Sequence, residues 1–183
     1  IDGPYLELWK SRLWLTKSDE LNFSVYASNV NDETKFPTGG QLNVSDEQGG
    51  NITGIAGIND LLLIFKSTSI FRFIGDVEFG PQLARYSDFG CVAPNTIAKI
   101  PGGVIYLARD GLRLTDGIDP VGLELSRPIR SLFASRSAET IYTGAVGVYH
   151  APTDSYYLKL VTTDAHTYVL QRVILPTDRG DVA

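Results

Sequence analysis

The segment "GGVIYLARDGLRLTDG" (Gly102–Gly117) decides the fold class of this sequence, because it holds two short apolar runs separated by a turn pair. The runs 103–109 and 112–115 flank Asp110-Gly111. An Asp-Gly pair between apolar runs favours a type I′ turn, which needs positive φ at both turn positions. The segment therefore predicts a β-hairpin.

The same segment contains Asp110 and Asp116, with Asp119 just beyond, and three nearby carboxylates could also form a metal or catalytic site. A calcium loop needs closely alternating oxygen ligands that end in a bidentate acid. The spacing here does not follow that pattern. Asp-Gly and Asp-Pro pairs are typical of turns, so we interpret all three residues as turn residues and predict no catalytic, cofactor-binding or metal-binding residues among them.

Further hairpins follow from short β-branched and aromatic runs bounded by Gly, Asn, Asp and Ser. The runs predicted to pair are 5–16 with 20–28, 60–66 with 69–75, and 145–150 with 156–163, and one more strand is expected at 167–175.

The turns of these hairpins recur at about residues 19, 68, 111 and 153, which gives spacings of 49, 43 and 42 residues. A hairpin every ~40–50 residues is typical of β-propeller blades with four strands each. We expect an all-β domain over residues 1–183, a β-propeller or propeller fragment of about four blades. The expected units are approximately 5–50, 51–95, 96–140 and 141–183. A β-sandwich is the alternative.

One short helix is expected in this β domain. In "LSRPIRSLFAS" (125–135), Ser126 can cap the helix and Pro128 lies in its first turn. Long polar loops are expected at 29–51 and 76–96.

Composition narrows the possible function classes. The net charge of −5 gives no reason to expect a basic nucleic-acid surface. One cysteine, Cys91, excludes an internal disulfide, and with His150 and His166 it cannot complete a zinc quartet. We expect Cys91 to be buried and inert. No apolar run reaches the ~18 residues of a membrane helix, and because Met is absent we expect the chain to be a piece of a longer one.

Three other residue sets could carry chemistry. An arginine cluster for a carboxylate ligand could be drawn from Arg12, Arg72, Arg85, Arg109, Arg113 and Arg127, although a solvated strand face explains most of them. Glycan acceptor triplets begin at Asn22, Asn43 and Asn51, and chance explains them better. The aromatic residues on the predicted strands favour a buried core over a stacking platform; they are Trp9, Trp14, Phe23, Tyr26, Phe65, Phe71, Phe73, Tyr106, Tyr156 and Tyr157.

An ordered set of segments resembles tail proteins of tailed bacteriophages. "WKSRLWLT…LNFSVYAS", "NITGIAGINDLLLIFKSTSIFRFIGD" and "FGCVAPNTIAKIPGGVIYLARDGLRLTDG" are similar to successive propeller elements of these proteins, and "LSRPIRSLF" is similar to the short helix that follows. The resemblance runs from about Trp9 to Phe133.

This resemblance implies a virion protein of the nozzle or tail-tube type found in short-tailed phages. Such a protein is structural, has no cofactor, and forms a six-fold homo-oligomeric ring through which genomic DNA passes without sequence-specific binding. Neighbouring tail or connector proteins are the expected partners. The alternatives are a carbohydrate- or receptor-binding propeller, which would use exposed aromatic and Asn or Asp side chains, and a hydrolase of the same architecture.

Overall fold

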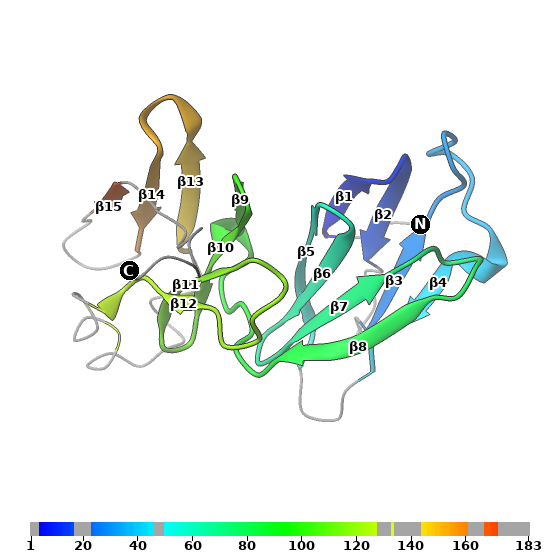
Figure 1. Ribbon diagram of the computed structural model, residues 1–183, viewed down its shortest axis with the longest axis horizontal. Coiled ribbons are helices and arrows are strands. Elements are labelled where there is room, and N and C mark those ends of the chain that lie inside the picture. The colour runs from blue at the N-terminus through cyan, green and yellow to red at the C-terminus, as the bar shows by residue number, and fades with distance from the viewer. Residues whose placement is uncertain are drawn as a thin grey trace, which may run out of the picture.

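The computed structural model describes residues 4–16, 23–45, 50–127, 133 and 144–160, and the backbone of 167–171. The described residues form an all-β fold of four antiparallel sheets (Figure 1). Sheets 1 and 2 contain β1 (Leu6–Trp9), β2 (Arg12–Thr16), β3 (Ser24–Ala27), β4 (Gln41–Asn43), β5 (Ile52–Ile58), β6 (Leu61–Lys66), β7 (Ile70–Ile74) and β8 (Gln82–Ser87). Sheets 3 and 4 contain β9 (Ala98–Ile100), β10 (Gly103–Ala108), β11 (Gly111–Thr115), β12 (Leu123–Glu124), β13 (Val146–His150), β14 (Ser155–Lys159) and β15 (Thr167–Gln171).

Each sheet is a meander in which consecutive strands pair, so no strand crosses from one sheet to another. The first strands of the four sheets begin at residues 6, 52, 98 and 146, at intervals of 46, 46 and 48 residues. These intervals are more even than those between the hairpin turns. The reason is that the turn near residue 153 joins the first two strands of sheet 4, whereas the other three turns join second and third strands.

The sheets stack face to face in chain order, and one apolar cluster fills each junction. The first cluster, with Trp14 and Phe73, lies between sheets 1 and 2. The second, with Phe65 and Tyr106, lies between sheets 2 and 3. The third, with Leu107, Tyr156 and others, lies between sheets 3 and 4. Sheets 2 and 3 are therefore covered on both faces, which is why β6 and β10 are almost continuously apolar.

Neighbouring sheets contact one another through their first strands or the strand next to them. First strands meet at β1 with β5 and at β9 with β13, whereas β5 lies beside β10, the second strand of sheet 3. In Figure 1, sheets 1 and 2 fill the right half of the view and sheets 3 and 4 the left half.

Three sequence-based expectations were wrong in detail. The run 5–16 contains two strands, because Lys10 and Ser11 adopt left-handed conformations, with φ of 50° and 56°, and form a two-residue turn. The predicted loops 29–51 and 76–96 contain β4 and β8, which are mostly exposed edge strands with little apolar pattern.

The turn at Asp110-Gly111 is not type I′, because only Gly111 has positive φ, 137°. Gly111 pairs with Ala108, so the turn residues are Arg109 and Asp110. A Cβ atom on Gly111 would lie 2.0 Å from Ser126 Oγ, which is a second reason for glycine here. The helix expected at 125–135 lies mostly outside the described residues.

Candidate functional site

The first strands of sheets 1, 2 and 3 line a cavity of about 390 Å³, here called the central pocket. Its walls are formed by residues 4–7 of the first sheet, 54–56 of the second, and Pro94, Ile97 and Lys99 of the third. The central pocket therefore collects residues from three sheets that lie far apart in the sequence.

An ion pair spans the central pocket. Lys99 Nζ lies 2.6 Å from Glu7 Oε1, which also accepts a hydrogen bond of 3.2 Å from the backbone N–H of Gly57. The Glu7 side chain is 12% exposed and the Lys99 side chain 52%. The pair thus joins sheet 1 to sheet 3 across β5, and its lysine end is open to solvent.

Two glycines in β5 let the neighbouring sheets approach closely. A Cβ on Gly54 would lie 2.3 Å from Ile97 Cδ1, and one on Gly57 would lie 2.4 Å from Trp9 Cδ1. The "ITGIAGI" pattern of β5 therefore reflects close packing of β1 on one side of the strand and of the residue just before β9 on the other.

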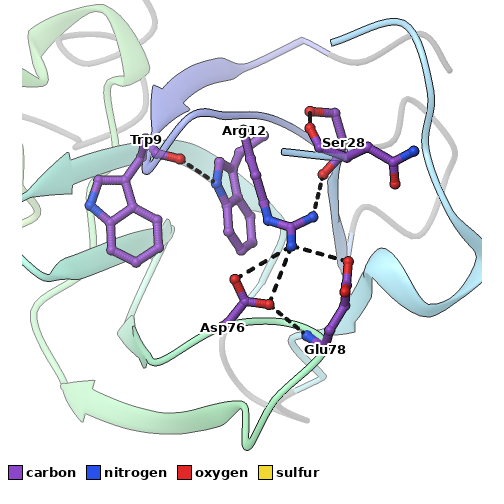
Figure 2. Close-up of polar contacts among 7 residues, drawn as sticks. Trp9, Arg12, Ser28, Asp76 and Glu78 are labelled. Atoms are coloured by element: carbon purple, nitrogen blue, oxygen red, sulfur yellow. Dashed lines mark hydrogen bonds and ion pairs between the residues drawn. The ribbon is translucent and has the colours of Figure 1, made fainter. Parts of the chain in front are cut away.

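A buried arginine connects sheet 1 to the loop between β7 and β8 (Figure 2). Arg12 Nη1 donates to Ser28 O at 2.8 Å, and Nη2 lies 3.3 Å from Asp76 Oδ1 and 3.0 Å from Glu78 Oε1. The Arg12 side chain is 4% exposed, whereas its two carboxylate partners are almost half exposed. We call this group the Arg12 latch.

A similar connection joins sheet 2 to the loop between β11 and β12. Arg72 Nη1 donates to Gly117 O at 3.0 Å, and the Tyr86 hydroxyl lies 2.9 Å from Thr115 Oγ1 and donates to Asp119 O. Burial raises the pKa of Tyr86 to about 12. Polar side chains of one sheet thus hold the third-to-fourth strand loop of the next sheet.

The structure places the three aspartates of the opening segment in separate turn interactions. Asp110 forms an ion pair with Arg113, whose guanidinium stacks on the ring of Phe89 at 3.5 Å. Asp116 accepts from the backbone N–H groups of residues 118 and 119, and Asp119 accepts from that of residue 121. The carboxylates of Asp116 and Asp119 satisfy backbone donors of the loop, as expected for turn residues.

Cys91 is fully buried between sheets 2 and 3, as predicted. Burial raises the pKa of its thiol to about 12, so the reactive thiolate is disfavoured. His150 is exposed at the end of β13, with Nδ1 2.8 Å from Thr153 Oγ1. His166 lies outside the described residues.

The candidate arginines do not share one ligand site. Arg12 and Arg72 hold loops of different sheets, Arg113 pairs with Asp110, and Arg85 pairs with Asp88 at 2.8 Å. The expectation of a solvated face was wrong for Arg12 and Arg113, which are 3% and 6% exposed, because each fills a junction between elements.

The predicted aromatic core is confirmed for the seven residues that are buried: Trp9, Trp14, Phe65, Phe71, Phe73, Tyr106 and Tyr156. Trp9, Trp14 and Phe73 form a triangle with ring centroids 5.3–6.1 Å apart. Of the three glycan acceptor positions, Asn43 and Asn51 are exposed and Asn22 lies outside the described residues.

Within the described ranges, no group of three or more His, Cys, Asp or Glu side chains is arranged to hold a metal ion. Over the same part of the chain, no helix has the length and apolar character needed to cross a bilayer. No protein-family model and no curated protein matches this sequence.

Sequence reasoning missed the central pocket and the Arg12 latch. Glu7 and Lys99 are 92 residues apart, and Arg12 is 64 residues from Asp76. No local pattern links such residues. The glycines of β5 were a usable signal, because glycine in a strand often marks close approach of another backbone or side chain.

Proposed function

We propose that this chain is a structural β-propeller module of a bacteriophage tail, a nozzle or tail-tube component that forms part of a ring around the DNA channel and performs no catalysis. The observation that carries the proposal is the stack of four consecutive meander sheets. Radially repeated four-stranded meanders are the construction of a propeller.

Two features of the stack support the propeller part of the proposal. First strands contact one another at two junctions, β1 with β5 and β9 with β13, while the fourth strands β4 and β8 are mostly exposed, as in blades arranged around an axis. The intervals of 46, 46 and 48 residues between first strands match the length of a four-stranded blade.

The polar contacts support a mechanical role. The Arg12 latch, the Arg72 contact and the Glu7–Lys99 pair each connect different sheets. Contacts between sheets resist sliding of one sheet over the next, which suits a part that must keep its shape while DNA passes. The net charge of −5 fits a channel that does not grip phosphates.

Electron microscopy of phage particles that carry this gene tests the proposal. Antibodies raised against the purified chain are expected to label the tail, and quantitative mass spectrometry of the particles is expected to give a copy number that is a multiple of six. Absence of the chain from purified particles would overturn the proposed role.

The second candidate, a carbohydrate- or receptor-binding propeller, is favoured by the central pocket. It presents Tyr5, an accessible lysine and a carboxylate within one cavity. A glycan array separates the two candidates: binding that is lost in Lys99→Ala would favour this second function, whereas the tail proposal expects no specific binding.

A further inference from the structure

Within the part of the chain that the structure describes, sheets 1 and 4 each have one face that no other sheet covers, and each of these faces carries exposed aliphatic side chains. On β1, Glu7 and Trp9 point toward sheet 2, as their contacts with Gly57 and Asn59 show. The alternate residues Leu6 and Leu8 point the other way and are 67% and 63% exposed.

Apolar side chains on this face of sheet 1 extend over three strands. Leu6 pairs with Leu15, Leu8 pairs with Leu13, and Leu15 pairs with Tyr26, so all five side chains share this face, on which Leu6 and Leu8 are exposed and Leu15 is buried. Further out, on β4, the face becomes polar at Gln41 and Asn43.

Sheet 4 shows the matching arrangement at the other end. Tyr156 and Leu158 on β14 belong to the cluster shared with sheet 3. Val146 and Val148 on β13 lie on the opposite face and are 47% and 58% exposed, with Tyr157 beside Val148. This face therefore also begins with aliphatic side chains on a first strand, and it carries Lys159 opposite Val146 as well.

The internal junctions define which faces fit together. At all three junctions, the face of one sheet that points toward the next sheet in the chain packs on the face of that next sheet that points back toward it. Among the described residues, the face of sheet 4 that points away from sheet 3 and the face of sheet 1 that points away from sheet 2 are both uncovered, so sheet 1 of a second copy can follow sheet 4 in the way that each sheet follows the one before it. We propose that two copies of this chain close on each other, with sheet 4 of each copy packed on sheet 1 of its partner.

The size and symmetry of this contact are close to those of ordinary two-fold protein dimers. A sheet face at about 4.8 Å strand spacing and five residues in length covers roughly 300 Å² for the four strands of sheet 1 and roughly 240 Å² for the three described strands of sheet 4. Each copy contributes two such faces to the contact. Because protruding side chains add to the flat area of a face, the surface buried per copy approaches the roughly 800 Å² per partner of a standard interface. A head-to-tail contact that occurs twice closes under a two-fold axis and leaves no free sheet face.

Light scattering with matched variants gives the first test. The purified chain is expected to have twice its monomer mass of 20.0 kDa. Leu8→Lys and Val148→Lys should each give the monomer, because each puts a charge in both junctions. Ile118→Lys is the control, since Ile118 is 74% exposed in the loop between β11 and β12 and should leave the dimer intact.

The same faces allow a test by complementation. Leu8→Lys and Val148→Glu are each expected to be monomeric alone. Mixed in equal amounts they should form a heterodimer, in which one junction carries a Lys–Glu pair and the other is unchanged. Circular dichroism that matches the unsubstituted chain confirms that each variant is folded.

Cross-linking identifies which faces meet. A short bis-maleimide should join Leu8→Cys to Val148→Cys when the two variants are mixed, and neither variant alone should cross-link, because Cys91 is buried. The inference would be overturned if the unsubstituted chain stays monomeric in light scattering. It would also be overturned if the Leu8→Cys variant cross-links with a second copy of itself. The inference rests on the stacked sheets and not on the tail location, so failure here and absence from phage particles are separate results.

Discussion

The inner sheets 2 and 3 and the terminal sheets 1 and 4 are built on the same meander but carry different sequence patterns. In sheet 3, all residues of β10 and β11 are buried, because an apolar cluster lies on each face. In the terminal sheets, β1 and β13 alternate between more and less exposed residues. The difference shows that the position of a sheet in the stack, rather than its topology, determines how continuous its apolar pattern is.

The largest expected effect is at the junction between the inner sheets. Phe65 is fully buried, with its ring centroid 5.1 Å from that of Tyr106. Phe65→Ala should lower the free energy of unfolding by about 3–5 kcal/mol, measured by urea denaturation. Val148→Ala on the uncovered face of sheet 4, made in the monomeric Leu8→Lys chain, is the matched control and should change the stability of that monomer by less than about 0.5 kcal/mol. Equal losses at both positions would contradict the distinction between inner and terminal sheets.

A smaller effect is expected where sheet 1 meets sheet 2. Gly57→Ala would place a Cβ 2.4 Å from Trp9 Cδ1, so the tryptophan or β1 must shift. Overpacking of this kind costs about 1–3 kcal/mol. Near-ultraviolet circular dichroism and tryptophan fluorescence should change with the loss of stability. Gly39→Ala, which meets nothing within 4 Å, is the control and should leave both signals unchanged.

The Arg12 latch tests whether polar contacts hold the terminal sheet in place. Arg12→Met removes the guanidinium but keeps much of the apolar stem, and the carboxylates of Asp76 and Glu78 remain accessible to water. We expect a loss of about 1–2 kcal/mol, as for hydrogen bonds to charged groups. Arg85→Met, which removes a more exposed pair with Asp88, should cost less than about 0.5 kcal/mol. A result in which Arg85→Met is the more harmful change would refute this role for the latch.

The smallest effect concerns pH at the inner junction. Burial raises the pKa of Cys91 from 9.0 to about 12, so the folded state keeps the thiol proton that the unfolded state loses. Stability is therefore fully present below pH 9 and is lost as pH rises toward 12. From this group alone, we expect about 1 kcal/mol between pH 9 and 10.

The thiol can be separated from the tyrosines that also titrate in this range. Cys91→Ala should reduce the stability lost between pH 9 and 10, and the native thiol should resist a thiol reagent at pH 8 until the chain unfolds. Rapid labelling of the folded chain at pH 8 would show that Cys91 is not in the buried site described here.

The sequence predicted the inner strands better than the first and fourth strands of each sheet. The runs 60–66, 69–75 and 103–109 match β6, β7 and β10 to within one residue at each end, because continuous apolar runs between turn residues are strong signals. β5 was missed because its glycines serve close packing rather than apolar burial. β8 was missed because an edge strand is paired on one side only and shows little apolar periodicity.

The interactions between sheets could not be predicted from the sequence for a different reason. Glu7–Lys99 and Arg12–Asp76 depend on how whole sheets stack, and that arrangement brings together residues 64 or more positions apart. By contrast, the roles of Asp116 and Asp119 were predictable, because an Asx turn depends only on residues two or three positions away.

The proposed role as a module of a phage tail is tested most directly by electron cryomicroscopy of phage tails. If the proposal holds, a tail contains density for this chain with its meander sheets stacked face to face in chain order, in rings whose copy number is a multiple of six. A tail that lacks the chain, or a chain whose sheets do not follow one another in that order, would contradict it.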